Sequence, residues 1–408
     1  MLATLVPLFD ENLSVMAYSL FSQKANYLTD PIFSVSARFD GAGSIDGLEI
    51  LESIGVSTLS DGKVIFIPVN NVSIFASISD TYSVPKSQYV FLIDNTVLPS
   101  EMYINRLKDL KSQGYKIAIR KVMVSQYEDY KPIFELCDYV FINTKKVDIS
   151  KAKVYFTKLY PNIKIIAGNI QGQLEFYNLT QEGGYSLFEG PFYRTPVTKG
   201  DTEVAPLKMN YIELLNIVND PNFDLTKAAD VIGRDTALVI SLLKIVNRMS
   251  VNSEITTIRH AAAMLGQKEL RKWITTAVAQ QLCTDKPNEI MRISLIRAKF
   301  AESLAKYFDM GSVSGELFLM GLFSVIDLIL DKPMADALNT LNLSNPIKEA
   351  LIDGTGDYAH VLEFIIEYEN ANWQEISRVG ILNNMKMDDV YNAYISTLSW
   401  YRDLFIDK

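Results

Sequence analysis

The sequence predicts two domains of different class: an α/β domain over residues 1–200 and an all-helical domain over residues 201–408. Three observations predict this division. In the first half, short runs of β-branched and aromatic residues alternate with helical segments. The stretch EGPFYRTPVTKGDTEVAP (189–206) is rich in Pro, Gly and Thr, which is typical of a linker. After it, apolar residues recur at helical spacing almost to the end.

Seven segments of the first half have the composition of β-strands. Several are continuous apolar runs, as in a parallel sheet that is covered on both faces. They are ATLVPLF (3–9), VMAYSLFS (15–22), VIFIPV (64–69), YVFLID (89–94), YKIAIR (115–120), YVFIN (139–143) and KIIAGN (164–169). Helical segments lie between them, for example 100–114, where Ser100 is a candidate N-cap and Gly114 a stop, and 175–184. The alternation predicts βα units, arranged in either an α/β barrel or an open sheet.

The second half consists of amphipathic helical segments. Residues 236–249 carry an apolar stripe at positions i, i+3, i+4 and i+7. Asp224 and Asp235 each stand where an N-cap is expected, at the start of a helical segment. Residues 258–282 are predicted to form two helices that are broken at Gly266. This pattern favours a helical bundle.

Composition limits the classes of function. The formal net charge of −9 argues against general binding to nucleic acid, which needs a basic surface. Six cationic residues and two glutamates fall within 244–272, and a charged, exposed helix face explains them. The two cysteines, Cys137 and Cys283, predict neither a disulfide framework nor a zinc site, and a buried environment is expected for both. The N-terminus does not resemble a signal peptide, and no run approaches the ~20 apolar residues of a transmembrane helix. A soluble cytoplasmic protein is expected.

The first half contains short motifs in an order that resembles the EAL domain, a barrel that hydrolyses cyclic di-GMP. The motifs are LVPLFDENLSVMAYSLF, KVIFIPVNN, YVFLIDNTV, GYKIAIRKV, DYVFINTKKVDI, IIAGNIQGQLEF and the closing LFEGPFYRTP. The resemblance covers residues 1–196 and lies in the order of the motifs more than in any one of them. It implies a TIM-like α/β barrel.

The resemblance also identifies positions at which that family carries metal-binding and catalytic residues. In the family these are acids, an asparagine and a lysine. The matching positions here are Ser19, Pro68, Ile93 (or its neighbour Asp94), Arg120, Lys121, Phe141, Asn143, Gly168 and Gln171. Two-metal hydrolysis needs several anionic oxygen ligands, and a cationic pair at a strand end would repel Mg²⁺. We therefore expect a vestigial site without metal, cofactor or hydrolytic activity.

Two interpretations of the cationic pair remain open. Arg120 and Lys121 could meet the phosphates of a bound nucleotide, or they could pair with nearby carboxylates such as Asp94. Gln23 stands about where the family carries an arginine, which argues against nucleotide binding.

The second half resembles the HDOD domain, a helical relative of HD phosphohydrolases that has lost the metal ligands. The motifs are the Asp-Pro turn at 220–221, GRD at 233–235, LLKIVN at 242–247 and AAMLGQKELRKW at 262–273. Where HD enzymes carry a His-Asp pair, this sequence has Ser324 and Val325. The chain has two histidines, His260 and His360, too few for such a site. No metal site is predicted here either.

Two phosphohydrolase-like domains without their ligands predict a catalytically inactive regulator in bacterial signalling, related to cyclic di-GMP, that acts as a protein-interaction scaffold. Its expected partners are other signalling proteins, with weak nucleotide binding and a homodimer as open alternatives. Neither nucleic acid nor a membrane is expected as a partner. The main alternative function is a non-catalytic receptor for cyclic di-GMP. A residual phosphodiesterase and nucleic-acid binding through residues 244–272 are further alternatives.

Overall fold

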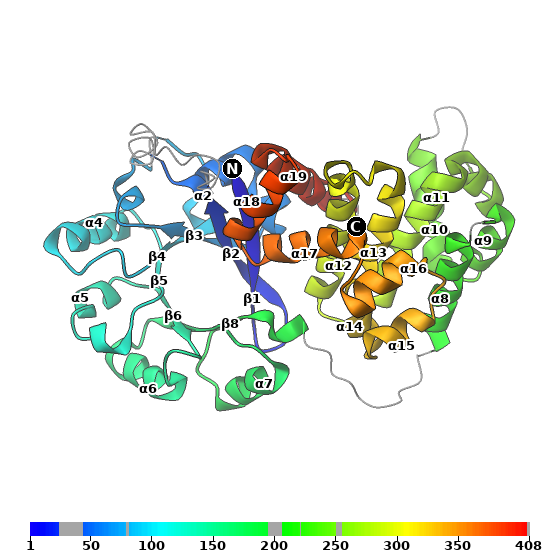
Figure 1. Cartoon of the computed structure of the whole chain (residues 1–408). Helices are drawn as coiled ribbons and strands as arrows, with labels where there is room; N and C mark the ends of the chain where they lie inside the picture. The colour runs from blue at the N-terminus through cyan, green and yellow to red at the C-terminus, as the bar shows by residue number, and fades with distance from the viewer. Residues whose placement is uncertain (24–43, 79–80, 195–205, 221, 250–254, 406–408) are drawn as a thin grey trace. The chain divides into compact units, whose positions relative to one another are not determined.

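The structure, a computed structural model, describes most of the chain (Figure 1). The described residues are 1–23, 44–78, 81–194, 206–220, 222–249 and 255–405. They form two compact units: one of residues 1–195, 306–311 and 363–408, the other of residues 196–305 and 312–362. The C-terminal segment 363–408 thus belongs to the unit that contains the strands. The predicted domain limits, 1–200 and 201–408, stay predictions, because contacts define a compact unit whereas a domain is defined by independent folding.

The strands of the first unit form a closed eight-stranded barrel in the order β1 to β8. They are β1 (Leu2–Phe9), β2 (Val15–Gln23), β3 (Val64–Val69), β4 (Tyr89–Ile93), β5 (Ile117–Ile119), β6 (Tyr139–Asn143), β7 (Lys164–Gly168) and β8 (Leu187–Glu189). β1 is antiparallel to both of its neighbours, β2 and β8, and all other pairs are parallel. The barrel alternative to an open sheet is therefore correct. β8 is a correction, since its residues were expected to form a closing loop.

The interior of the barrel is filled by alternate side chains of the strands, as the period of two requires. The cluster consists of Leu8, Ala17, Phe66, Val90, Leu92, Ala118, Phe141 and Ile166. Phe66 meets Phe141 edge to face, with 5.5 Å between ring centroids. The barrel is therefore a packed core, and a ligand can reach only its open ends.

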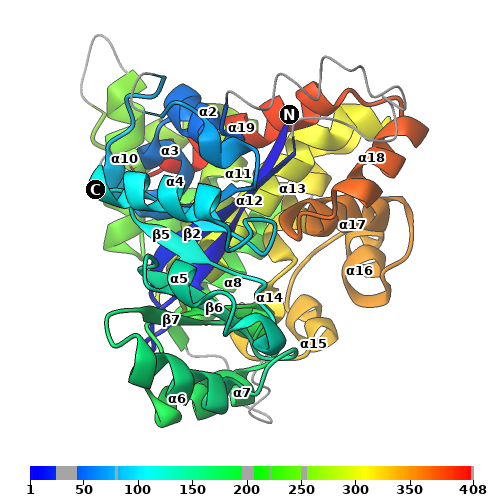
Figure 2. The same cartoon turned by 90° about the vertical axis from the view of Figure 1, so that its left-hand side faces the viewer.

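Helices cover the outside of the barrel (Figure 2). They are α2 (Asp46–Ile54), α3 (Val56–Ser60), α4 (Glu101–Ser112), α5 (Lys131–Phe134), α6 (Ile149–Leu159) and α7 (Gln173–Glu182). The same unit contains the end of α17 (Asp357–Glu369), α18 (Trp373–Leu382) and α19 (Met387–Asp403). α19 packs against β1 and α3. The N-terminal amino group pairs with Asp388 at 2.7 Å, and Arg402 donates to the Thr58 hydroxyl, so both ends of α19 contact the barrel.

The second unit is helical, as predicted. Its helices are α8 (Pro206–Asn219), α9 (Leu225–Ile232), α10 (Thr236–Met249), α11 (Ile258–Leu282), α12 (Asn288–Leu304), α13 (Ser314–Phe323), α14 (Ile326–Leu330), α15 (Met334–Asn339), α16 (Asn345–Lys348) and the start of α17. Asp224 and Asp235 accept backbone N–H groups at the starts of α9 and α10. Ser100 is the N-cap residue of α4, but its side chain makes no capping hydrogen bond. α11 is broken at Gly266, whose φ of 73° suits glycine.

α12 and α13 cross closely at Gly321. A Cβ atom at this position would lie 2.5 Å from the carbonyl oxygen of Arg297, which no side chain tolerates. Ser294 also donates to the carbonyl oxygen of Leu322 at 2.7 Å. Glycine is therefore required here by the approach of the two helix backbones, not by a turn.

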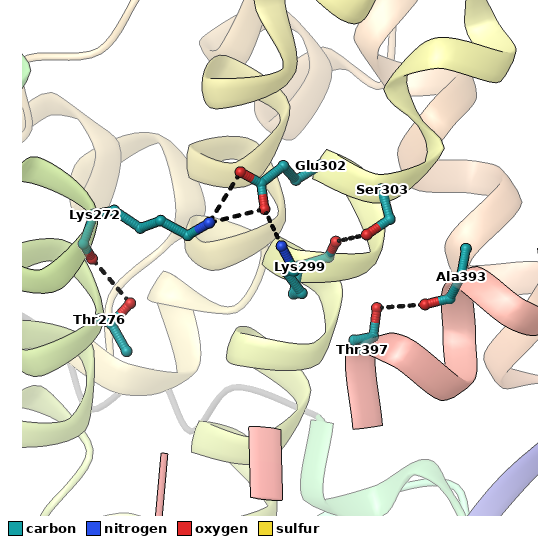
Figure 3. Close-up of polar contacts among 7 residues, drawn as sticks. All are labelled: Lys272, Thr276, Lys299, Glu302, Ser303, Ala393 and Thr397. Carbon is teal, nitrogen blue, oxygen red and sulfur yellow. Dashed lines mark hydrogen bonds and ion pairs between the residues drawn. The ribbon is translucent and has the colours of Figure 1, made fainter. Parts of the chain in front are cut away.

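Charged residues of the 244–272 segment are partly paired. Lys272 of α11 and Lys299 of α12 both donate to Glu302, at 3.1 Å and 2.7 Å (Figure 3). Arg259 pairs with Asp230 at 3.2 Å. Two of the six cationic residues of the segment, Lys272 and Arg259, are therefore paired with acids outside it. Cys137 and Cys283 are both buried free thiols, and within the described ranges no helix is long and apolar enough to cross a membrane.

Candidate functional site

The carboxyl ends of the parallel strands surround a cavity of about 480 Å³ at the mouth of the barrel. Because side chains alternate, the residues two positions beyond the interior cluster point to this mouth. In β4, β5, β6 and β8, or directly after them, these residues are Asp94, Arg120, Asn143 and Glu189. Cavity walls in this position are the usual location of binding sites in α/β barrels.

Arg120 is held inside the mouth by one carboxylate and two rings. Its Nη2 lies 3.6 Å from Glu189 Oε1, and its guanidinium carbon lies 5.3 Å and 5.4 Å from the ring centroids of Phe21 and Phe141. Ser19 donates to the other oxygen of Glu189 at 3.2 Å. Arg120 and Glu189 are mostly buried, with side chains 21% and 12% exposed. The charge of Arg120 is therefore balanced within the barrel.

Lys121 has a different environment from its neighbour. Its φ of 63° turns the chain at the end of β5, and its side chain is 62% exposed. The ammonium group lies 3.3 Å from Asp94, as one of the two interpretations of the cationic pair predicted. Burial alone would raise the pKa of Asp94, but hydrogen bonds from Thr96 and the charge of Lys121 outweigh it and hold that pKa below its usual range.

The structure brings some of the predicted positions together and separates others. Arg120, Lys121, Phe141, Asn143 and Gly168 line the cavity, and Ser19 lies beneath it, bonded to Glu189.

Three predicted positions lie outside the cavity lining. Pro68 is exposed on β3, and Gln171 donates to Asn169 in the loop after β7. Ile93 points away from the mouth into an apolar layer that includes Leu107 and Leu110 of α4. Of the two residues considered for that position, Asp94 is therefore the one near the mouth.

Several residues of the mouth were missed. Glu189 ends β8, Lys146 follows β6, Arg194 ends a 3₁₀ turn (Pro191–Arg194), and Glu369 and Asn370 come from the C-terminal segment. The motif LFEGPF was a usable signal for Glu189, since its glutamate directly precedes a glycine. Nothing local marks Glu369, because its place in the cavity depends on a distant part of the chain.

Gly190 shapes the mouth beside Glu189. Its φ is 152°, and a Cβ atom would lie 2.1 Å from the carbonyl oxygen of Ile170. Ile170 in turn donates its N–H to the carbonyl oxygen of Glu189 at 3.0 Å. Close approach of these two loops therefore requires glycine and sets the position of the Glu189 carboxylate.

The residues of the mouth do not fit a two-metal centre. Hard cations need several unpaired carboxylate or carbonyl oxygens. Asp94 and Glu189 are the acids that the described strands present here, and each already faces a cation. In the described residues, no group of three or more His, Cys, Asp or Glu side chains could hold a metal ion.

The second unit places a buried cation beside Ser324, which the resemblance matches to the His-Asp pair of HD enzymes. Arg297 of α12 is 5% exposed and donates to the Ser324 hydroxyl at 3.2 Å. Asp327 lies nearby, and burial raises its pKa although the charge of Arg297 opposes this. His260 and His360 are both exposed and far from Ser324 in sequence. The local chemistry favours packing over metal binding.

Comparisons with known proteins give a family and two relatives. The model of the HDOD domain matches residues 204–349. The uncharacterized protein YuxH of Bacillus subtilis (strain 168) is 25% identical over 98% of both chains. The cyclic di-GMP phosphodiesterase CdgJ of Vibrio cholerae serotype O1 is 26% identical over 79% of this chain and 75% of its own.

One solved structure, the EAL-like domain protein YdiV, is similar over 46% of this chain and 88% of its own, with 12% identity and a TM-score of 0.36. The predicted order of the two halves is confirmed. The chain consists of a closed eight-stranded barrel followed by a helical region, of which residues 204–349 match the model of the HDOD domain.

Proposed function

We propose that this chain is a catalytically inactive regulator in cyclic di-GMP-related bacterial signalling, and that it acts by binding other signalling proteins. The relative CdgJ is named as a cyclic di-GMP phosphodiesterase, which supports the pathway but not the activity. The observation that carries the proposal is the barrel mouth, where Arg120 and Lys121 neutralise the two acids at the strand ends.

The chemistry of the mouth supports inactivity. Phosphodiester hydrolysis by two metal ions needs carboxylates that hold both ions and activate water. Here Glu189 accepts from Ser19 and faces Arg120, so it has little capacity left for a cation. A divalent ion would also have to displace the arginine from between Phe21 and Phe141. The residues present therefore favour a closed polar network over a reaction centre.

The HDOD unit supports the same conclusion from a separate position. Arg297 is buried beside Ser324, and a fixed guanidinium repels a metal ion at that point. Both units nevertheless retain extensive apolar cores. Two domains that keep their cores but lack a reaction centre can still offer folded surfaces to other proteins. We therefore propose protein partners, and a second copy of the chain is one of them.

A turnover assay tests the proposal directly. The full chain is incubated with cyclic di-GMP and either Mg²⁺ or Mn²⁺, with CdgJ as the positive control. We expect no linear product above the buffer background. Turnover by the wild-type chain that is lost in Arg120→Ala would refute inactivity and make the mouth a reaction centre of a new kind.

One observation favours a second candidate, a non-catalytic receptor for cyclic di-GMP. The 480 Å³ cavity is lined by four cations, and a cavity of this size is typical of small-molecule sites. Calorimetric titration of the full chain with the nucleotide distinguishes the candidates. Saturable heat without turnover would favour the receptor, and no heat at high protein concentration would exclude it.

A further inference from the structure

The C-terminal segment contributes a carboxylate to the barrel mouth. Glu369 and Asn370 line the cavity together with the strand-end residues. Glu369 Oε2 lies 3.0 Å from Arg194 Nη1, and the two side chains are 12% and 24% exposed. This is a short, largely desolvated ion pair inside a cavity wall, and charge-assisted pairs of this kind are among the stronger polar contacts.

Glu369 is held in place by its neighbour, Tyr368. The Tyr368 ring is fully buried against Trp373 and Tyr394, with centroid distances of 5.3 Å and 4.9 Å. Its hydroxyl accepts the backbone N–H of Ala3 in β1 at 3.4 Å. The backbone beside residue 369 is therefore anchored to the barrel.

The position of Glu369 is unfavourable for an acid in other respects. It is the last residue of α17, where the helix dipole presents partial negative charge. The contact with Arg194 offsets this cost, and any ligand that takes Arg194 also lets the carboxylate move away from the helix terminus.

The remaining charges of the mouth favour an anionic ligand. Four cations line the cavity, Arg120, Lys121, Lys146 and Arg194, against two lining carboxylates, Glu189 and Glu369, and a third carboxylate, Asp94, which pairs with Lys121 beside the lining. Lys146 is exposed, and the described residues place no carboxylate against it. Arg194 Nε also donates to the Tyr193 hydroxyl at 3.0 Å, whereas Nη1 faces Glu369. Without Glu369, Arg194 would lose this carboxylate, and phosphate oxygens could take its place beside Arg194 and Lys146.

We propose that Glu369 is an internal competitor for phosphate-bearing ligands: its carboxylate occupies Arg194 and so limits the affinity of the barrel mouth for anions. This inference deepens the proposed function. It rests on that function in one respect, which is that the barrel mouth binds anions without hydrolysing them. A guanidinium donates to a carboxylate or to a phosphate in the same forked geometry, so the two anions compete for one group. The C-terminal segment thereby sets the ligand affinity of a barrel from which it is distant in sequence.

The test compares Glu369→Gln with a matched control, Glu375→Gln. Glu375 lies in the same segment and is paired with Arg378, but it is outside the cavity lining. The full chain is titrated with pyrophosphate in a calorimeter at low ionic strength. Loss of one negative charge beside the ligand should tighten binding by Glu369→Gln about tenfold or more, because charges at this distance couple strongly. Glu375→Gln should match the wild type.

Two further variants make the result decisive. In Glu369→Gln combined with Arg194→Ala, the gain should disappear, because it comes from the guanidinium that no longer faces the Glu369 carboxylate. Glu369→Asp, which shortens the side chain by one methylene, should give a smaller gain and guards against misfolding of the glutamine variant. Equal affinity of Glu369→Gln and Glu375→Gln, a gain that survives Arg194→Ala, or no binding by any variant would each overturn the proposal. Hydrolysis of cyclic di-GMP by these variants would instead count against the proposed function.

Discussion

Arg120 and Lys121 are adjacent cations, yet the structure predicts very different effects when each is replaced by alanine. Arg120 is mostly buried between two aromatic rings and faces Glu189 at 3.6 Å. Lys121 is 62% exposed and faces Asp94 at 3.3 Å. If distance alone decided, the Lys121–Asp94 pair would contribute more to stability than the Arg120–Glu189 pair. Burial reverses this order, because exposed pairs are screened by water whereas buried ones are not.

The magnitude follows from the interactions that each side chain makes. For Arg120→Ala, a partly buried ion pair contributes about 1–2 kcal/mol, between the values for exposed and fully buried pairs. Two cation–π interactions add about 0.5–1 kcal/mol each. The expected decrease in the free energy of unfolding is therefore about 2–4 kcal/mol. Lys121→Ala should cost about 0.5 kcal/mol or less, as exposed ion pairs do.

Urea unfolding of the barrel unit measures both effects. The chain has three tryptophans, of which Trp373 and Trp400 belong to the barrel unit and Trp273 to the other. In a Trp273→Phe background, fluorescence therefore reports on the barrel unit. Equal destabilisation by Arg120→Ala and Lys121→Ala, within about 0.5 kcal/mol, would refute the argument that burial decides the energetics.

Two further predictions concern backbone packing and pH. Gly190→Ala should abolish the soluble, folded barrel, because its Cβ atom would overlap the Ile170 carbonyl oxygen, whereas Gly172→Ala, with open space around it, should fold normally; circular dichroism and soluble yield compare them. Burial opposes ionisation of the Glu302 carboxyl, but the hydrogen bond from Lys299 and the charge of Lys272 outweigh burial and lower the pKa of Glu302. A depressed pKa adds stability above the unfolded-state value of about 4.3, which is lost as pH falls through the folded value. The unfolding free energy of the wild type should therefore fall more steeply below about pH 5 than that of Glu302→Gln, and parallel curves would contradict this assignment.

The strands of the barrel illustrate what a local pattern can predict. β4 is a continuous apolar run because both of its faces are buried, and this requirement is visible in the sequence itself. β8 has three residues, Leu187–Glu189, which is too short to show a period. It is a strand because β1 and β7 supply its hydrogen-bonding partners, and no local pattern contains that information.

Side-chain direction at the mouth depended on register. Ile93 and Asp94 are neighbours, yet one faces the helices and the other the mouth, since a shift of one residue exchanges the faces of a strand. The resemblance to EAL domains left these two residues as candidates for one of the positions at which the family binds metal. The pairing of β4 with its adjacent strands decides which of the two side chains faces the mouth.

The sequence by itself determined the two fold classes, the strands that are buried on both faces, the helix caps Asp224 and Asp235, and the presence of cations where acids were expected. These features are local, because burial, periodicity and capping act over a few residues. Tertiary structure alone decided which anions meet those cations. Ser19 and Glu189 are 170 positions apart, and Glu369 returns to the mouth from the C-terminal segment. Such pairs form because the barrel closes and because the C-terminal segment packs against it. Both events bring together residues that share no local pattern.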